Sequence, residues 1–382
     1  MQTTISRAIR ASIHLLLLVL PNVATQAAAG TDSRFSDPED GQFDLSEHLL
    51  NHKGFLPIPL IITEPALDFG GGVGLLWFSD SLASSGERAK TGHGRFTPPA
   101  MGGLFGFRSG NGSKGAGGGY FIPLDDDRHR YLGGAGAVDL QLDHYSLRGD
   151  ARSYALSGTG LVQQWLSRLG DSDWFIGPRY VFFRSEARFG GSGQPDRLPR
   201  DLDVRISQLT AVIDYDSRDN MFTPNRGDFL EIELGTVNQA LGASVDYNSL
   251  NARGYHYEPL GKQIVLGLRG DARSVSSGAP FFAQPYVNLR GVPALRYQDS
   301  RTLVAETEVR WNVTPRWAVI GFAGAGKAFG ERSSWDGSET VHAGGIGLRY
   351  LLARKLGLYG GIDLARGPED NAVYIQIGSA WR

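Results

Sequence analysis

Residues 321–327 match the spacing of a phosphate-binding loop, because they read G-x-x-x-x-G-K. Such a loop also needs a serine or threonine that binds magnesium and a helix whose N-terminus faces the phosphates. Ala328 stands where the hydroxyl residue should be, and residues 329–337 have the composition of a turn. The glycines are therefore better explained by a strand that bends or lies close to another backbone.

Other spacings that are typical of catalysis or metal binding are weak. The sequence contains no G-x-S-x-G or H-E-x-x-H, and its eight histidines do not fall in metal-ligand spacing. His144 beside Asp143 could serve a hydrolase with a distant serine, but a solvated strand end explains this pair better. Residues 125–127 are three aspartates without the spaced ligands and the glycine of a calcium loop, so they predict a polar turn. We expect no enzyme activity, no cofactor and no metal site.

The elements that carry these residues are predicted to be β-strands, since apolar and polar residues alternate along most of the chain after residue 56. In residues 303–312 the odd positions are mostly apolar, while Glu306 and Glu308 share the opposite face. A soluble β-sandwich would alternate too. Charges in mid-strand and segments long enough for the roughly 9–11 residues of a tilted membrane crossing favour a water-filled barrel. The number of segments, together with the even strand numbers of single-chain barrels, predicts an all-β, transmembrane antiparallel β-barrel of 16 strands.

The N-terminus has the layout of an export signal. Arg7 and Arg10 precede an apolar run at residues 11–20, and small residues follow at 24–29. The run is shorter than the roughly 20 residues that a membrane anchor needs, and Pro21 ends it. We therefore predict a signal peptide at residues 1–29, a short periplasmic lead-in at 30–56 and a barrel domain at 57–382 in the bacterial outer membrane.

The composition excludes several protein classes. The chain has no cysteine, which excludes disulfide-linked domains and thiolate metal sites but suits a barrel closed by backbone hydrogen bonds. The net charge of −2 gives the protein no excess of positive charge that would attract nucleic acid, so we expect no nucleic-acid partner. The 52 glycines suit tightly curved strands. The expected surroundings of such a barrel are outer-membrane lipid and lipopolysaccharide.

Four segments carry more specific motifs. They are Gly54–Ile62 with the glycine-rich residues 68–78, the hairpin from Asp216 through Arg218, Asp219 and Pro224 to Gly227, the run Leu289-Arg290-Gly291-Val292, and the closing residues 345–382. In this order they resemble the barrel entry, the D-x-R-D-x-x-F-x-P-x-x-G hairpin, the V-R-G-F/Y loop tip and the last strands of the BamA/TamA bacterial surface antigen family. The resemblance implies a long loop that folds back into the barrel and places Arg290 and Gly291 inside it.

The family holds its loop arginine with an aspartate in F-x-D-x-G, but Gly324 stands at that position here. Arg290 would then depend on Glu306 or Glu308, which the alternation places in the lumen. We expect Glu308 to be the main partner, because Glu306 could serve Arg310 instead. Restoring the acid with Gly324→Asp should tighten the loop.

The resemblance implies a factor that inserts or translocates outer-membrane or secreted client proteins through a weak seam between the first and last strands. The pairing of these two strands would be weakened by glycines, which lack side-chain contacts, at Gly70, Gly72, Gly74 and Gly378. Trp381 is also expected in the last strand, at the seam. The chain departs from the family in Val292 at the loop tip, in its Trp-Arg ending, and in having no room for the family's POTRA domains before the barrel. The alternative function is a passive pore or a structural barrel without a client.

Overall fold

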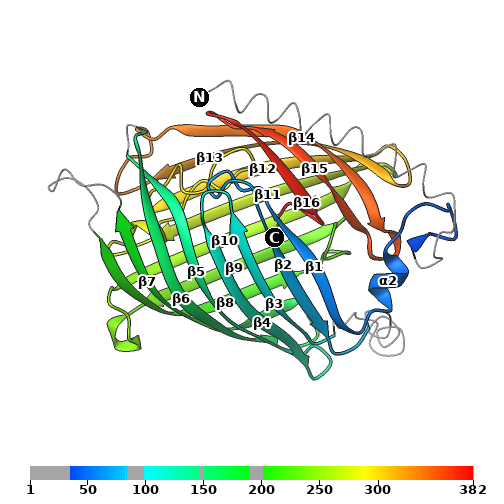
Figure 1. Ribbon diagram of the computed structural model, residues 1–382, viewed down its shortest axis with the longest axis horizontal. Helices are drawn as coiled ribbons and strands as arrows, with labels where there is room; N and C mark the ends of the chain where they lie inside the picture. Colours follow the sequence, from blue (N-terminus) through cyan, green and yellow to red (C-terminus); the bar gives the residue numbers. More distant parts are fainter. Residues whose placement is uncertain (1–34, 82, 84–98, 147–148, 190–200, 382) are drawn as a thin grey trace.

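Sixteen strands form one antiparallel sheet, which confirms the predicted strand number and fold class. The computed structural model describes residues 35–81, 83, 99–146, 149–189 and 201–381. Each strand pairs with its neighbours in sequence, and the sheet curls into a barrel (Figure 1). The short helix α2 (Ser46–Leu50) lies at one end of the barrel, which we call the α2 rim; the opposite end is the far rim.

The strands begin at Gly54, three residues before the predicted boundary at 57. In chain order they are β1 (Gly54–Ile62), β2 (Gly70–Phe78), β3 (Met101–Ser109), β4 (Lys114–Leu124), β5 (His129–Tyr145), β6 (Ala151–Arg168), β7 (Trp174–Phe189), β8 (Leu202–Asp216), β9 (Gly227–Val237), β10 (Tyr247–Pro259), β11 (Ile264–Val275), β12 (Arg301–Asn312), β13 (Trp317–Phe329), β14 (Thr340–Ala353), β15 (Leu358–Arg366) and β16 (Asn371–Ile377). Short 3-10 turns η2 (Gln239–Leu241), η3 (Phe281–Ala283) and η4 (Arg354–Leu356) lie in the connections.

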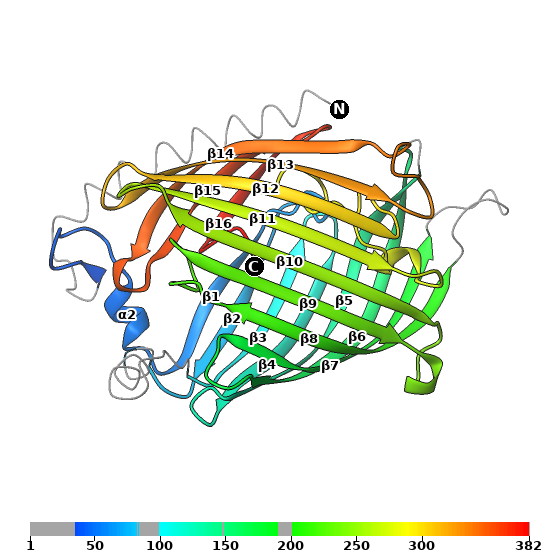
Figure 2. The same cartoon turned by 180° about the vertical axis from the view of Figure 1, so that it is seen from behind.

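The wall of the barrel is uneven in height. Strands β5 to β8 have 15 to 18 residues, whereas β1, β2 and β3 have nine each and β16 has seven. The shortest strands are therefore those nearest the two ends of the sheet. Figure 2 shows the tall wall of the same barrel from behind.

The alternation predicted for β12 is present in the structure. Leu303 and Val309 are exposed on the outer face, while Glu306 and Arg310 are buried on the inner one. The phosphate-loop spacing at residues 321–327 lies within β13, as expected for strand glycines. No helix in the described ranges is long and apolar enough to cross a bilayer.

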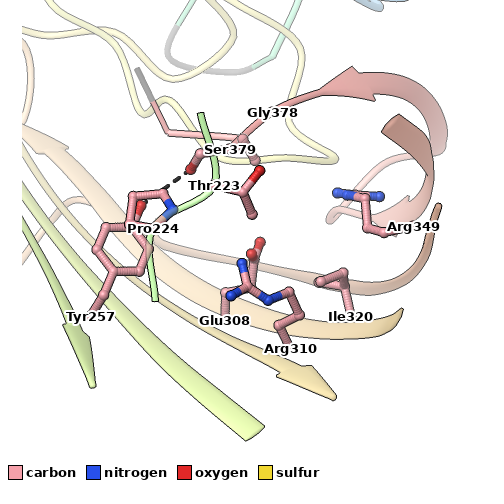
Figure 3. A pocket seen from close by; sticks show the side chains of 10 residues that line it. Thr223, Pro224, Tyr257, Glu308, Arg310, Ile320, Arg349, Gly378 and Ser379 are labelled. Atoms are coloured by element: carbon pink, nitrogen blue, oxygen red, sulfur yellow. Dashed lines mark hydrogen bonds between the residues drawn. The ribbon is translucent and has the colours of Figure 1, made fainter. Parts of the chain in front are cut away.

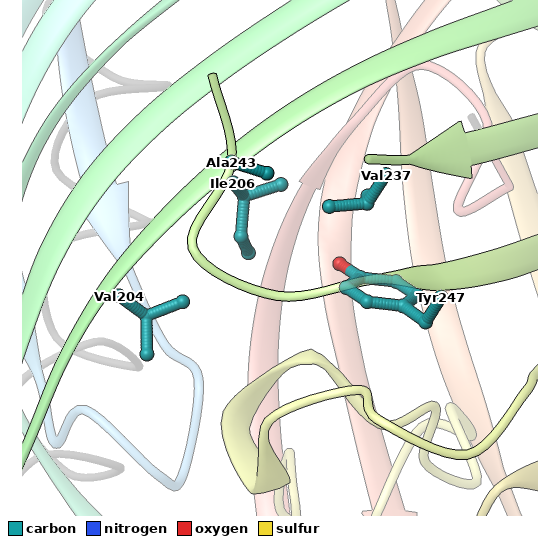
Figure 4. Close-up of a cluster of buried hydrophobic side chains, with 5 residues drawn as sticks. All are labelled: Val204, Ile206, Val237, Ala243 and Tyr247. Atoms are coloured by element: carbon teal, nitrogen blue, oxygen red, sulfur yellow. The ribbon is translucent and has the colours of Figure 1, made fainter. Parts of the chain in front are cut away.

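The core lies inside the barrel, where loops pack against the inner wall. The connection between β11 and β12 folds inward, and its Phe281 ring lies 5.0 Å from that of Tyr154 and 5.4 Å from that of Phe189. Figure 4 shows a second part of this core near the far rim, where Val204 and Ile206 of β8 meet Tyr247 of β10. These contacts show that the long loop is folded inward.

Residues 36–50, which we call the N-terminal strap, dock on turns at the α2 rim. The guanidinium of Arg316, in the turn between β12 and β13, is buried and pairs with Asp37 at 2.5 Å, Asp40 at 2.7 Å and Asp44 at 2.6 Å. The backbone N–H of Leu45 donates to the carbonyl of Leu352 at 2.7 Å. Because β1 begins shortly after the strap, these contacts tie the start of β1 to the turn between β12 and β13 and to the end of β14.

Arg316→Ala should loosen the strap, because it removes the buried cation shared by three carboxylates and leaves only Arg354, which pairs with Asp37 and Asp40. The loss of several charge-assisted hydrogen bonds should cost at least about 2 kcal/mol of docking free energy. Limited proteolysis should then cut within residues 36–50, whereas Arg226→Ala, at an exposed arginine of another turn, should leave the strap protected. Unchanged protection in Arg316→Ala would contradict this account.

The docked strap should also weaken in acid. The hydrogen bond from Arg316 lowers the pKa of Asp40 from 3.8 to about 2. A carboxylate with a lowered pKa contributes stability that is complete above its unfolded pKa and is lost as the pH falls through the folded one. Strap protection should therefore be constant above pH 4 and fall between about pH 4 and 2, whereas Asp40→Asn should flatten this part of the pH profile.

Candidate functional site

Arg290 lies inside the barrel, at the tip of the inward loop, and is surrounded by carboxylates. Its Nε and Nη2 donate to Glu306 Oε1 at 2.9 and 2.7 Å. Its Nη2 also lies 2.7 Å from Glu308 Oε2, and its Nη1 donates to Asp363 Oδ2 at 3.0 Å. The guanidinium centre lies 3.6 Å from the centroid of the Phe322 ring, close enough for a cation–π contact. We call Arg290 with these three carboxylates the loop anchor.

The third carboxylate of the anchor, Asp363, was not predicted from the sequence. Asp363 lies on β15, is fully buried, and also pairs with Arg349 at 2.6 Å. It supplies the acceptor that the family motif would have provided at position 324. One feature of the sequence could have identified it: Asp363 is the single charged residue in the otherwise apolar segment 361–365. Strand alternation places this residue on the inner face.

Gly324 is excluded as a place for that acid. A Cβ at this position would lie 2.7 Å from Leu289 Cδ2 and 2.9 Å from the carbonyl oxygen of Ala305. Gly324→Asp would thus push the loop away, and the expectation that it tightens the loop is wrong. Gly291 is also constrained, since its φ is +95° and its N–H donates to Tyr374 Oη at 2.9 Å.

Glu306 is not reserved for Arg310, contrary to the sequence-based expectation. Its second oxygen, Oε2, accepts from Arg269 Nη1 at 3.2 Å and from Trp381 Nε1 at 2.9 Å. Arg310 instead donates to the side chain of Asn225, in the turn between β8 and β9. Glu306 therefore joins the loop, the wall and the end of the chain.

The end of the chain enters the lumen instead of completing the last strand. Strand β16 ends at Ile377, and Gly378 has a φ of +80°, a conformation that favours glycine. Trp381 is then buried over Gly267, where a Cβ would lie 2.9 Å from the indole ring. Figure 3 shows Ser379 beside Tyr257, with their hydroxyl oxygens 3.1 Å apart. The expectation that Trp381 belongs to the last strand is wrong; we call residues 378–381 the C-terminal tail.

The hairpin motif lies at the α2 rim and contacts this tail. Arg218 donates twice to Asp216 at 2.8 Å, and Asp219 Oδ1 accepts the N–H of Asn225 at 2.9 Å. Gly227 has a φ of +100° and lies too close to the Ser217 carbonyl to carry a side chain. Pro224 lines a small cavity with Ser379 and other residues of the tail (Figure 3). The motif therefore shapes a turn that packs against the C-terminal tail at the α2 rim.

The two ends of the sheet, β1 and β16, do not pair with each other, although both strands lie wholly within the described ranges. We call this opening the seam. Gly70, Gly72 and Gly74 lie on β2, one strand away from the seam, so their expected place in it is wrong. A Cβ at Gly72 would lie 2.2 Å from the Gly106 carbonyl, and one at Gly74 would lie 2.8 Å from Ile58 Cγ1. These glycines allow close packing among β1, β2 and β3.

The remaining candidates for chemistry lie apart from the anchor and the seam. The His144 ring packs on Phe281 at 5.1 Å, and Asp143 accepts from the Ser153 hydroxyl at 2.7 Å. Asp127 lies in a turn and pairs with Arg130 and Arg168. Among the described residues, no group of three or more histidine, aspartate or glutamate side chains is arranged so that it could hold a metal ion.

Known structures provide a comparison for this geometry. BamA from Haemophilus ducreyi, lacking POTRA domains 1–3, matches with a TM-score of 0.60 and 12% identity over 86% of this chain and 70% of that one. CdiB from Acinetobacter baumannii and CdiB from Escherichia coli match with TM-scores of 0.57 and 0.59, each at 10% identity. This chain has the fold of the BamA and CdiB barrels. No family model and no curated protein sequence matches it.

The matches cover 85% and 84% of this chain but only 59% and 61% of the two CdiB chains. The chain thus spans about 60% of the length of these neighbours. They are bacterial outer-membrane barrels, so the fold agrees with the outer-membrane location and with the family resemblance read from the motifs. At such low identity, the likeness concerns the fold.

Arg290→Ala should free the inward loop, because it removes the cation shared by the buried Glu306 and Asp363 and the partly buried Glu308. Breaking a buried ion pair by removing one partner costs about 3–5 kcal/mol. Residues 280–300 should become sensitive to added protease, and Arg290→Lys should be intermediate because it keeps the charge without the planar set of donors. Arg296→Ala is the matched control, since Arg296 lies on the same loop and pairs with Glu369 at 2.9 Å. Equal cleavage in Arg290→Ala and Arg296→Ala would show that the anchor does not hold the loop.

Proposed function

We propose that this barrel assists the insertion or translocation of polypeptides at the outer membrane, using the seam as a template for an incoming strand. The observation that carries the proposal is the sixteen-stranded sheet whose first and last strands are not paired. An unpaired strand edge offers a row of N–H and C=O groups that can bind an extended segment of another chain. The function implied by the family resemblance uses this same edge.

The chain itself disfavours closure of the seam. Strand β16 has only seven residues, and its continuation turns inward at Gly378. Pro57 and Pro59 lie in β1, which pairs with β2 over its whole length. Proline is tolerated in an edge strand where its missing N–H points away from the paired neighbour, so the free edge of β1 is short of two donors. The free edges of β1 and β16 are therefore expected to pair only weakly with each other.

The inward loop argues against a simple pore. The loop anchor and the buried Trp381 both occupy the lumen beside β12. A passive pore would need this material to move before solutes could pass. We therefore favour function at the seam over conduction through the lumen.

Closing the seam chemically should abolish activity while leaving the barrel folded. Ile61 and Val373 are both exposed on the outer face, and the chain has no cysteine of its own. Ile61→Cys combined with Val373→Cys, joined by a short bismaleimide, should stop assisted insertion of an in vitro translated eight-stranded barrel into liposomes. Each single cysteine with the same reagent is the control.

A photo-crosslinking amino acid at Ile61 or Val373 should capture the inserting barrel, while the same group at Leu209 on β8, which is exposed to a similar extent, should not. Full activity of the joined protein would refute seam templating. Capture that is equal at all three sites would do the same. Ion conductance without any capture would establish the passive pore instead.

A further inference from the structure

The inner wall of the barrel is apolar on the side of β1. Leu142 of β5 faces inward, because it is buried in a cluster with loop residues Phe281 and Phe282. The strand registers place Gly136, Gly117, Phe105, Gly74 and Ile58 on this same face, one on each of the strands from β5 to β1. The inward positions of each strand are every second residue from these. None of them in β1 to β4 carries a charged side chain, and neither does any in β5 between Leu132 and Leu142.

This surface, which we call the apolar wall, includes Leu56, Ile58, Leu60, Phe105, Phe121 and Leu132. Part of it is not covered by the rest of the protein, since Phe105 is 45% exposed and Leu132 is 36% exposed. The aromatic rings lie flat across glycines of β4: a Cβ at Gly117 would be 3.1 Å from Phe105 Cε1, and one at Gly115 would be 2.6 Å from Phe107 Cε1. The wall is therefore smooth as well as apolar.

The opposite inner wall is charged, and several of its charges pair with each other. Arg253 pairs with Glu231 at 2.6 Å, and Arg269 pairs with Asp271 at 3.1 Å. The interior of an outer-membrane barrel is ordinarily polar, so an uncovered apolar surface across five of the sixteen strands is a departure that needs a ligand or a partner. A molecule that suits this lumen has a long apolar part and a polar end.

The apolar wall continues to the membrane across the seam. On β1 the outward residues Phe55 and Ile61 are exposed, while Leu56, Ile58 and Leu60 face inward, so both faces of this strand are apolar. The free edge of β1 separates the two faces. The side chains on both faces of this strand therefore offer apolar contact to an acyl chain that passes from the bilayer to the lumen around its edge.

We propose that the apolar wall binds the acyl chains of a membrane phospholipid, which enters and leaves the lumen through the seam. The paired charges of the opposite wall suit a zwitterionic headgroup with a single phosphate. The apolar wall itself has no basic residue for the several phosphates of lipopolysaccharide. An extended peptide fits less well, because its backbone amides would face a surface without polar partners. The inference goes beyond the proposed function, since it uses the same seam but needs no protein client.

A phosphatidylethanolamine with a diazirine near the end of one acyl chain tests this inference in proteoliposomes. Annular lipid should label outward residues such as Leu209 in any case. Lipid in the lumen should also label inward residues of the apolar wall, among them Phe105 and Leu132. Joining Ile61→Cys to Val373→Cys should abolish the inward labels when the link is made before the lipid is added, and leave the label at Leu209.

Variants of the wall provide a second measurement. Phe105→Asn combined with Leu132→Asn should lower inward labelling at Leu60 by about tenfold, because two apolar contacts with the chain are lost. Phe105→Leu combined with Leu132→Met is the matched control and should keep the labelling. Both original residues are partly exposed, so the variants should still fold, which heat-modified gel migration would verify.

The outcomes separate this inference from the proposed function. Labels confined to outward residues while the seam is open would overturn the lipid inference, even if a client is captured at Ile61. Lipid labels inside the lumen without any client capture would leave the lipid inference standing alone. Displacement of the probe by lipopolysaccharide but not by unlabelled phosphatidylethanolamine would overturn the choice of phospholipid. Capture of a peptide by a photo-crosslinking group at Leu132, without lipid labels, would assign the wall to the client.

Discussion

The carboxylate of Glu306 is the point at which the long loop, the barrel wall and the end of the chain meet. Its two oxygens accept from Arg290, Arg269 and Trp381, and its side chain is almost completely buried. A buried carboxylate is tolerated only when its partners satisfy it, so each partner contributes to keeping the others in place. The position of the inward loop and that of the C-terminal tail are thereby coupled through one residue.

The bilayer imposes a second constraint, since backbone groups within it must be hydrogen-bonded. The seam violates this rule at the edges of β1 and β16, and the structure limits the violation in two ways. The edge strands are short, so few groups are left unpaired. The N-terminal strap ties the start of β1 to the turn between β12 and β13 through Arg316. The opening is thus confined between a fixed rim and an inward-turned tail.

Strand periodicity was sufficient to predict the architecture. Because side chains alternate between the two faces of a strand, the sequence alone placed Glu306 and Glu308 on the inner face and identified a sheet of sixteen strands. The Arg290-Gly291 tip was found through its resemblance to a family motif. The same periodicity misplaced Trp381, because it continued the alternation of β16 past Gly378, where a positive φ turns the chain inward. The glycine-rich β2 was predicted to be the first strand of the sheet, which placed its glycines at the edge, one strand too far.

What the sequence determined by itself was therefore the local pattern: strands, their faces and the residues available inside. The tertiary structure decided which of these residues meet. Asp363 reaches Arg290 across 73 positions of sequence, and Trp381 reaches Glu306 across 75. The apolar wall likewise exists only because the registers of five strands align their glycine and apolar positions on one face. Alternation fixes the face of each residue, but register, sheet curvature and the path of the loop fix its neighbours, and these depend on the whole sheet.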